Sequence, residues 1–325
     1  MIFSRAPLRI SIGGGGTDLP SYYLKRNGFV ISSAINKYIY ISIGQTFNKK
    51  FLLKYSKLEE TTNIKKIKHP LFRETLSELK IRTPVNISSH ADIPSGSGLG
   101  SSGCFTVALI KALNGIQNKK INNRKLAELA CKIEIKKLKE PVGKQDQYTS
   151  TFGGLRSYNF LKSGEVIIKK INIKKKKLIN FKNSLSMYYT GILRDSYDIL
   201  KTQDIKSKKM NKEMLNNLDI IKEMGFNTKY ILEKGNIKEY GYLLKDHWET
   251  KKKRSSNMTS KYINKLYDYG LKNGAIGGKL IGAGGGGFLL FFSNNVKELD
   301  LAFDKINIKK MDFDFEFDGA KILSI

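Results

Sequence analysis

A stretch rich in glycine and serine, IPSGSGLGSSG, follows a strand-like pattern and precedes a helical one. Bare backbone N–H groups at the start of a helix, together with the helix dipole, favour an anion. Glycines there let the backbone bend around oxygen atoms that a Cβ would exclude. The pattern predicts a phosphate-binding loop made of Pro94, Gly96, Ser97, Gly98, Leu99, Gly100, Ser101 and Ser102. The alternative is an ordinary helix N-cap, in which Ser101 or Ser102 satisfies backbone donors.

Two carboxylates that follow this loop have a spacing that suits a magnesium nucleotide. Glu134 lies near the end of a helix predicted over residues 126–138, and a Pro-Val-Gly turn then leads back to Asp146. A magnesium ion on a nucleotide needs few protein oxygens, and a second carboxylate can accept a proton from a substrate hydroxyl. Composition alone favours a solvated carboxylate or a helix cap at Asp146.

Two further glycine runs flank this region, RISIGGGGTD at residues 9–18 and GAGGGGF at residues 282–288. Glycine loses the most backbone entropy on folding, so a run of it indicates that bare backbone is needed. Three turns of this kind in one chain predict a shared ligand.

The order of the elements indicates the fold class. Strand-like patterns dominate the first part, helical patterns fill residues 195–273, and strands return at the end. This order favours a two-domain α+β protein, and we place the domains at residues 1–180 and 181–325. The lysine-rich run from Lys169 to Asn183 is predicted to be a basic surface strand. Cys104 and Cys131 fall in apolar helical patterns and are predicted to be buried free thiols.

The formal net charge of +29 raises the question of a nucleic-acid partner. Lysine far outnumbers arginine and is spread along the chain, whereas nucleic-acid modules concentrate arginine in a patch. We therefore expect solvated lysines and no nucleic-acid partner, with a basic RNA-binding protein as the alternative from another class. No apolar window has the length of a signal peptide or membrane span, which predicts a cytoplasmic protein without a membrane partner. The sequence indicates no oligomeric state.

Three motifs in order resemble the GHMP kinase superfamily, named for galactokinase, homoserine kinase, mevalonate kinase and phosphomevalonate kinase. They are APLRISIGGGGTD, IPSGSGLGSSG and KLIGAGGGGFLLFF, and together they span nearly the whole chain. The spacing from Glu134 to GKQDQ also fits the family pattern. The resemblance implies an N-terminal domain like ribosomal protein S5 domain 2 and a ferredoxin-like C-terminal domain.

The resemblance also implies roles for individual residues, with ATP and Mg²⁺ as cofactors. The loop from Pro94 to Ser102 would bind the nucleotide phosphates, and Ser102 and Glu134 would hold magnesium. Asp146 matches the catalytic aspartate and Arg9 the basic residue that faces it. The turn at residues 282–287 would pack against the phosphate loop. The residues implied to bind the acceptor are Gly14, Gly15, Gly16, Thr17, Asp18, Gly284 and Gly285.

The acceptor side departs from galactokinases, which usually carry Gly-Glu-His-Thr-Asp where this chain has only glycines before Thr17 and Asp18. Galactose is therefore disfavoured. The motifs are most similar to the D-glycero-D-manno-heptose 7-phosphate kinases, which phosphorylate the anomeric hydroxyl on the route to GDP-heptose and surface glycans. A fucose- or galactose-type sugar-1-kinase remains the alternative within the superfamily.

A distal phosphate on the acceptor would need cationic or N–H partners. Arg156, Arg194 and Lys252 are candidates, although each is also explained as a solvated or ion-paired side chain. The three histidines, His69, His90 and His247, show no metal-ligand spacing and are predicted to be structural or surface residues, and Trp248 a packing residue.

Overall fold

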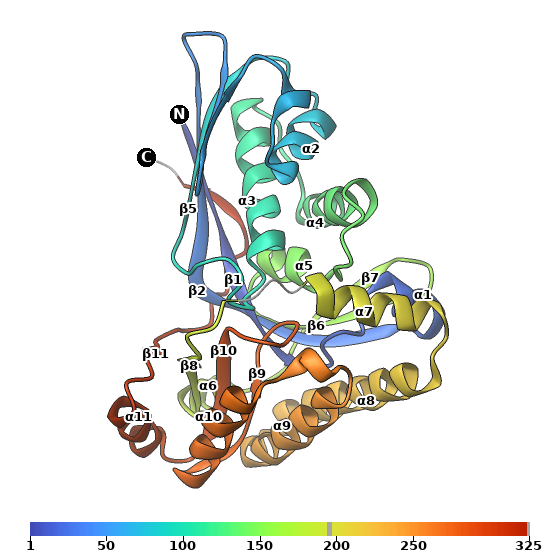
Figure 1. The fold of residues 1–325 in the computed structure, drawn as a ribbon, viewed down its shortest axis with the longest axis vertical. Helices are drawn as coiled ribbons and strands as arrows, with labels where there is room; N and C mark the ends of the chain where they lie inside the picture. The colour runs from blue at the N-terminus through green and yellow to red at the C-terminus, as the bar shows by residue number, and fades with distance from the viewer. Residues whose placement is uncertain (194–196, 324–325) are drawn as a thin grey trace.

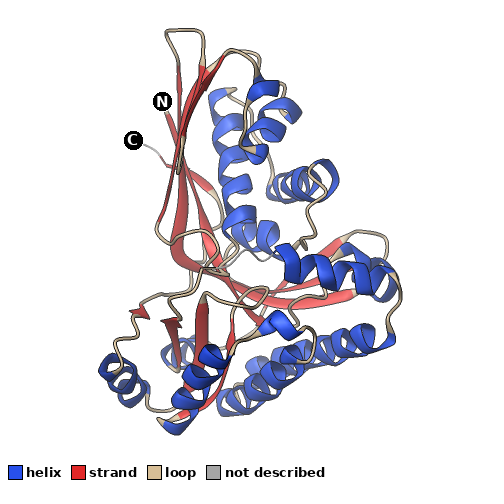
Figure 2. Cartoon of the chain, viewed as in Figure 1, coloured by secondary structure: helices blue, strands red, loops and turns tan. Residues whose placement is uncertain are grey.

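The computed structural model describes residues 1–193 and 197–323. Two β-sheets and the helices that cover them make up the described chain (Figures 1 and 2). The strands are β1 (Ile2–Gly13), β2 (Gly28–Gln45), β3 (Phe51–Lys54), β4 (Leu58–Thr61), β5 (Val85–Ala91), β6 (Leu155–Phe160), β7 (Val166–Lys170), β8 (Leu185–Tyr189), β9 (Ala275–Leu280), β10 (Phe288–Ser293), β11 (Lys310–Met311) and β12 (Lys321–Leu323). The α-helices are α1 (Pro20–Arg26), α2 (Pro70–Glu78), α3 (Ser101–Ile116), α4 (Asn123–Cys131), α5 (Gln145–Phe152), α6 (Lys175–Asn183), α7 (Tyr197–Lys208), α8 (Lys212–Lys234), α9 (Ile237–Lys252), α10 (Lys261–Lys272) and α11 (Val296–Lys305).

The first sheet is built around the long strand β2, which is 18 residues long. Its second half pairs with β5 and its first half with β6, so the described strands follow the order β12-β1-β2-β5-β3-β4 with β6 and β7 as a branch. Along β1, every second residue from Ala6 to Ile12 is apolar and buried, which gives the strand one face for a core. Helix α3 packs on β1 and β2, with α2, α4 and α5 beside it (Figure 1).

The second sheet consists of β8, β9, β10 and β11, all antiparallel, in the spatial order β11-β8-β10-β9. Numbered by their sequence in this half of the chain, the strands lie in the order 4-1-3-2. This is the ferredoxin-like arrangement that the resemblance implied. Helices α9, α10 and α11 pack on this sheet around a core that includes Trp248 and Phe291.

The predicted α+β class with two sheets is confirmed. The division at residue 180 stays a prediction, but one strand that it would assign to the second domain belongs to the first sheet. That strand is β12, which pairs with β1, so both described ends of the chain lie together (Figure 1).

The prediction of a basic surface strand from Lys169 to Asn183 is wrong for most of its length. Strand β7 ends at Lys170, and residues 175–183 form α6. The helix forms because Leu178 and Phe181 share one face at a spacing of three residues, and Phe181 is buried with its ring 5.0 Å from that of Tyr240. Lys175, Lys176 and Lys177, which precede Leu178, are exposed on the other faces of the helix.

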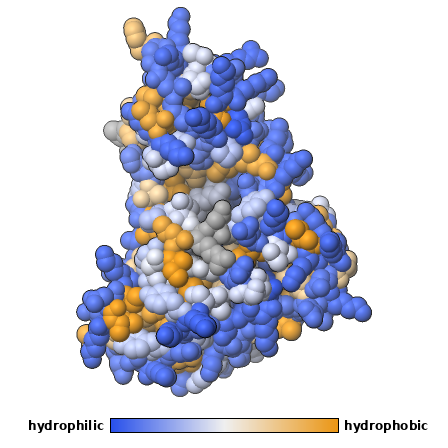
Figure 3. Space-filling model, in the orientation of Figure 1, coloured by the Kyte–Doolittle hydropathy of each residue, from blue (hydrophilic) through white to orange (hydrophobic). Residues whose placement is uncertain are grey.

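The surface, the cysteines and Trp248 agree with the predictions made from the sequence. The face in Figure 3 is predominantly hydrophilic, with apolar residues in small groups. Cys104 and Cys131 are buried and unpaired, and Trp248 is fully buried, as predicted. In the described chain, every helix is too short or too polar to cross a bilayer.

Candidate active site

A cavity of about 710 Å³ lies where the two sheets and their connecting turns meet. Its walls come from β1, the turn after β1, the loop before α3, the start of α5, the end of α9 and the turn between β9 and β10. Segments that are far apart in the sequence therefore share one site. All three glycine-rich turns contribute to it.

The loop before α3 has the shape of an anion cradle. Gly96, Gly98 and Gly100 have φ values of +78°, +83° and +80°, a region that side chains rarely adopt. A Cβ on Gly98 would lie 2.7 Å from the carbonyl oxygen of Ile281. The buried hydroxyl of Ser101 has no hydrogen-bond partner among the described residues. Both the backbone and this hydroxyl can therefore meet phosphate oxygens at the start of a 16-residue helix.

The structure does not support the alternative of an ordinary N-cap. The N-cap residue of α3 is Gly100, and no side chain caps the helix. The hydroxyl of Ser102 donates to Oε2 of Glu134 at 2.6 Å and is not used for the helix end. The free backbone donors of this helix thus remain available to a ligand.

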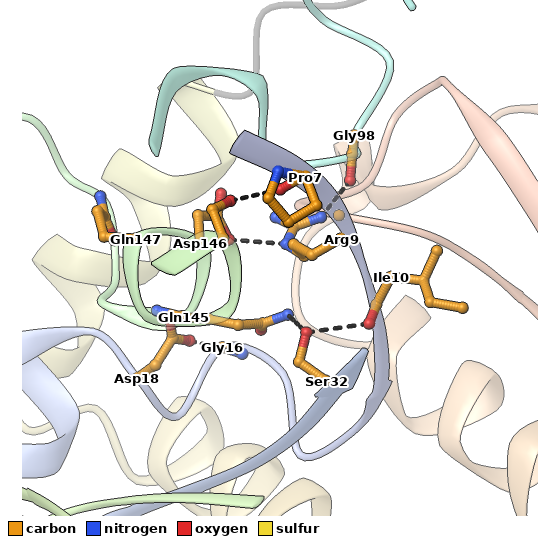
Figure 4. A network of polar contacts seen from close by, with 12 residues as sticks. Pro7, Arg9, Ile10, Gly16, Asp18, Ser32, Gly98, Gln145, Asp146 and Gln147 are labelled. Carbon is orange, nitrogen blue, oxygen red and sulfur yellow. Dashed lines mark hydrogen bonds and ion pairs between the residues drawn. The ribbon is translucent and has the colours of Figure 1, made fainter. Parts of the chain in front are cut away.

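Arg9 and Asp146 face each other beside this loop (Figure 4). Nε of Arg9 donates to Oδ1 of Asp146 at 2.7 Å, and Nη1 donates to the carbonyl of Gly98 at 2.5 Å. The side chain of Arg9 is 9% exposed and that of Asp146 is 27% exposed, so the carboxylate faces the cavity and the guanidinium supports it from behind. A Cβ on Gly103 would lie 2.7 Å from that of Asp146, and only glycine lets α3 approach α5 so closely.

Asp18 connects the first glycine turn to α5. Its Oδ1 accepts from the backbone N–H of Gly16 at 3.2 Å, and its Oδ2 from that of Gln145 at 3.0 Å (Figure 4). Burial raises the pKa of Asp18 and the bond from Gln145 opposes that rise. The hydroxyl of Thr17 donates to the carbonyls of Gly14 and Phe29 and fixes the turn.

Glu134 and Ser102 form the oxygen pair expected for magnesium. The helix α4 continues as a π-helix over Lys132–Lys137, which carries Glu134 inward, where it is 1% exposed. Gln147 Nε2 donates to its Oε1 at 2.9 Å, and burial raises the pKa of Glu134 to about 7. Hard oxygen ligands at hydrogen-bond distance from each other suit a Mg²⁺ that keeps its waters and phosphate oxygens. No group of three acidic, histidine or cysteine side chains able to hold a metal occurs in the described residues.

The third glycine turn packs against the phosphate loop, as the resemblance implied. Gly282 has a φ of +77°, and a Cβ there would lie 2.5 Å from the carbonyl oxygen of Gly98. A Cβ on Gly287 would overlap the carbonyl of Ser97. Gly284 lines the cavity, while the N–H of Gly285 donates to the carbonyl of Met258 at 2.9 Å and closes the turn.

The cavity brings together most of the predicted site residues. Those that line it are Arg9, Gly15, Gly16, Asp18, Gly96, Gly98, Gly100, Ser101, Ser102, Asp146 and Gly284. The predicted residues that do not line the cavity are Pro94, Ser97, Leu99, Gly14, Thr17, Glu134 and Gly285. Leu99 is a fully buried core residue whose carbonyl accepts from the N–H of Arg9 at 3.0 Å.

Two of the three candidates for a distal phosphate, Arg156 and Lys252, do not line the cavity. Arg156 donates to the carbonyls of Gly153 and Phe152, and Lys252 pairs with Glu249 at 2.7 Å. Lys252 therefore matches the ion-paired interpretation, whereas Arg156 is held by backbone carbonyls and is neither solvated nor ion-paired as expected. Arg194 lies outside the described residues.

Two groups of lining residues were missed by the sequence reasoning. One end of the cavity is aromatic, with Tyr55, His69 and Phe105, and the other part carries the buried polar side chains His247, Lys251, Arg254 and Lys279. His90 also lines the cavity, so all three histidines face it. Lys279 lies three residues before Gly282, at the start of the motif KLIGAGGGGFLLFF, which was a usable signal. The other missed residues lie in ordinary strand, helix or lysine-rich patterns, and the sequence offers no signal that would have identified them.

These parts form a set that can transfer a phosphoryl group. Such a reaction needs positioning and charge neutralisation more than covalent help from the protein. The loop before α3 can hold nucleotide phosphates, Arg9 adds positive charge beside them, and Asp146 can orient a hydroxyl. ATP and Mg²⁺ fit the residues that are present.

Comparison with known proteins agrees with this geometry. The models for the GHMP kinases N terminal domain and the GHMP kinases C terminal match residues 64–154 and 229–310. D-glycero-alpha-D-manno-heptose 7-phosphate kinase of Campylobacter jejuni is 30% identical, over 98% of this chain and 98% of that protein. Galactokinase of Thermotoga maritima is 25% identical, over 89% of this chain and 88% of that one.

A solved structure extends the match to the whole fold. The D-glycero-D-manno-heptose 1-phosphate kinase from Bacteroides thetaiotaomicron superposes with a TM-score of 0.81 at 25% identity, covering 100% of this chain and 99% of that one. The family models and the full-length relative agree on the family of the chain. The chain therefore belongs to the GHMP kinase family and is an ATP-dependent phosphotransferase that acts on a sugar hydroxyl.

Proposed function

We propose that this kinase transfers a phosphoryl group from ATP to the anomeric hydroxyl of D-glycero-D-manno-heptose 7-phosphate and forms the 1,7-bisphosphate. The observation that carries the proposal is the bare acceptor turn, where Gly15 and Gly16 line the cavity without side chains. A Cβ on Gly15 would point toward Oγ of Ser11, which also lines the cavity, so the bare backbone at Gly15 keeps this part of the wall open to an acceptor, whereas Arg254 fills the space beside Gly16. The names of two relatives, which differ in the position of the phosphate, both contain a phosphorylated heptose. In this proposal the product feeds GDP-heptose and surface glycan synthesis.

In the proposed reaction the acceptor lies between the first glycine turn and Asp146. Asp146 orients the attacking hydroxyl and takes its proton as the new O–P bond forms. Arg9 holds this carboxylate in place through the hydrogen bond from Nε and adds positive charge near the transferred group. Asp18 fixes the acceptor turn through Gly16 and offers a carboxylate to sugar hydroxyls.

The nucleotide lies along the other half of the cavity. Its phosphates occupy the loop that ends at Ser102, and Ser102 and Glu134 hold Mg²⁺, which neutralises phosphate charge when bound. The aromatic end, with Tyr55, His69 and Phe105, offers flat apolar surface for the adenine base. Phe105 lies one helical turn beyond Ser101 on α3, so in this proposal the base would lie next to the phosphates.

A panel of acceptors tests the proposal. The enzyme is assayed with ATP and D-glycero-D-manno-heptose 7-phosphate, the unphosphorylated heptose, fucose and galactose, and the phosphorylated hydroxyl is identified by NMR. We expect the heptose 7-phosphate to give the highest kcat/KM and the new phosphate on the anomeric oxygen. A preference for fucose or galactose would replace this substrate by that of the alternative sugar-1-kinase. RNA binding at physiological salt without turnover of any sugar would favour the RNA-binding alternative.

A further inference from the structure

Four basic side chains gather on one wall of the cavity, and none of them belongs to the loop before α3. They are Lys251 on α9, Arg254 just beyond that helix, Lys279 on β9, and His247 one turn before Lys251. All four line the cavity, although each is only 2–6% exposed. Long cationic side chains are almost never buried so deeply unless they are paired or bind a ligand.

The contacts of these side chains are with neutral atoms. Nζ of Lys251 donates to the carbonyls of Leu280 and Gly282 at 2.9 and 2.6 Å. Nζ of Lys279 donates to the carbonyl of Ile12 at 3.0 Å. These carbonyls fix the positions of the two ammonium groups, but they supply no negative charge.

Arg254 is held in the same way, between the acceptor turn and two amides. It donates to Oε1 of Gln203 at 3.1 Å, to Oδ1 of Asn217 at 3.2 Å and to the carbonyl of Gly15 at 3.5 Å. Every acceptor that the structure describes for Lys251, Arg254 and Lys279 is thus a neutral carbonyl or amide oxygen. Asp18 is the carboxylate whose charge acts on Arg254, and it does so without direct contact.

The positive charges of the group act unfavourably on one another. Burial, and then the charges of Arg9 and Arg254, lower the pKa of Lys279 to about 7. Burial and the neighbouring cations also lower the pKa of His247 well below its usual range. An anion beside these groups would reverse both effects.

Unsatisfied polar atoms lie at the same wall. Both ring nitrogens of His247 are buried and have no hydrogen-bond partner among the described residues, and the same holds for the hydroxyl of Ser11. Ser11 also lines the cavity, next to Gly15 of the acceptor turn. Buried polar atoms are normally hydrogen-bonded, so unpartnered donors around a cationic group indicate a polar ligand with several acceptor oxygens.

We propose that Lys251, Arg254, Lys279 and His247 bind a phosphoryl group that the acceptor already carries, and so select a sugar phosphate over the free sugar. The inference rests on the proposed function for the identity of the sugar. The acceptor is favoured over ATP as the source of the phosphate because Arg254 contacts the acceptor turn at Gly15, and the nucleotide has its own loop. The same donors would also accept the phosphate of another phosphorylated sugar.

Three substitutions test this site: Lys251→Met, Arg254→Gln and Lys279→Met, with Lys253→Met at an exposed neighbouring position as the matched control. Methionine retains the length of the side chain without its charge. We expect KM for the phosphorylated sugar to rise about 10- to 100-fold in the three variants, the usual effect of losing a hydrogen bond to a charged group. The dissociation constant of a non-hydrolysable ATP analogue should stay within about twofold of the wild-type value, a change too small to represent one lost contact. Binding of this analogue also shows that the variants are folded. The control should leave both constants unchanged.

The result separates the possible roles of the group. A matching loss of affinity for the ATP analogue would assign these cations to the nucleotide and overturn the inference. An unchanged KM for a phosphorylated heptose that is turned over would overturn it too, while the proposed function would stand.

A second measurement does not depend on turnover. Inorganic phosphate is titrated calorimetrically into enzyme whose nucleotide loop is saturated with the ATP analogue. Binding to the wild type that is lost in all three variants supports the site, even if the acceptor panel finds a different sugar phosphate and the proposed function fails. Absence of binding to the wild type, or binding that survives in the variants, contradicts it.

Discussion

The Nε atom of Arg9 lies 2.7 Å from Oδ1 of Asp146, and the other arm of the same guanidinium reaches the carbonyl of Gly98. One side chain on β1 therefore connects the carboxylate of α5 to the phosphate loop. Because Arg9 is buried and bonded to both groups, it fixes the position of the Asp146 carboxylate relative to the loop before α3.

Asp146→Asn should leave a folded protein that binds ATP but turns over slowly. The amide keeps the shape of the side chain and loses the ability to take a proton. We expect kcat to fall by about 10²- to 10⁴-fold, the usual contribution of a positioned general base. Steady-state kinetics and binding of an ATP analogue measure the two effects. Asp268→Asn, at an exposed position on α10, is the control. Near-normal turnover would remove Asp146 from the mechanism.

Arg9→Lys should lower kcat although it keeps the positive charge. An ammonium group cannot form the fork that reaches Asp146 and Gly98 together. We expect a loss of about 10- to 100-fold in kcat, with a smaller change in KM for ATP. Arg5→Lys, on the same strand, changes a partly exposed pair with Glu316 and a contact with the ring of Tyr38, neither of which lines the cavity, and should leave kcat unchanged. Equal kinetics for the two variants would show that the fork is dispensable.

The magnesium requirement should depend on pH through Glu134. Its pKa is raised to about 7, so the folded protein keeps this proton at pH 6 and releases it by pH 8. The cation needs the ionised form, and the affinity for Mg²⁺ should therefore increase as the pH rises through about 7. A magnesium titration of activity at several pH values measures this.

Glu134→Gln provides the comparison for that titration. The amide has no ionisation in this range, so its magnesium requirement should be higher and should lack the step near pH 7. Ser102→Ala should raise the requirement and keep the step. An unchanged titration in both variants would contradict the metal site.

The same raised pKa has a consequence for folding. Between the ordinary pKa of 4.5 and about 7, the folded protein holds a proton that the unfolded chain has lost. The contribution of Glu134 to the free energy of unfolding therefore falls as the pH rises through that window. Chemical denaturation of the wild type and Glu134→Gln at pH 5 and pH 8 should show a smaller difference between the two pH values in the variant.

Gly282→Ala should weaken ATP binding from a position outside the phosphate loop. Its φ of +77° costs a side chain about 1–3 kcal/mol, and its Cβ would lie 2.5 Å from the carbonyl oxygen of Gly98. The loop must shift to relieve this contact, so the affinity for an ATP analogue should fall together with Tm. Gly164→Ala has a similar φ of +89° with no atom within 4 Å, and it should lower Tm without changing that affinity.

The sequence motifs predicted the reacting centre because their chemistry is local. Residue type and spacing are enough to recognise a glycine turn, a hydroxyl at the start of a helix and a carboxylate that follows a turn. The basic wall could not be predicted in this way. Lys251 and Arg254 stand in a lysine-rich run that is indistinguishable from solvated surface, and only the packing of α9 on β9 buries them.

The lysine-rich run from Lys169 to Asn183 is a second case in which the sequence alone could not predict the structure. Lysine is compatible with both a strand and a helix on the surface, so the composition of this run could not show whether it forms a strand or a helix. The burial of Phe181 against Tyr240 of α9 decides it, and that contact joins residues far apart in the sequence.

Gly15→Glu should impair use of the sugar more than binding of ATP. Gly15 lines the acceptor side of the cavity, and a Cβ there would lie 2.8 Å from Oγ of Ser11. The new side chain would project into the space assigned to the sugar, and its carboxylate would stand beside Arg254, which contacts the carbonyl of Gly15. Gly15→Gln has the same size without the charge, so comparing KM for the acceptor in the two variants separates crowding from competition for the cations. A larger rise in KM for Glu than for Gln supports an anionic acceptor, whereas a greater loss of ATP affinity than of sugar affinity would show that this turn serves the nucleotide.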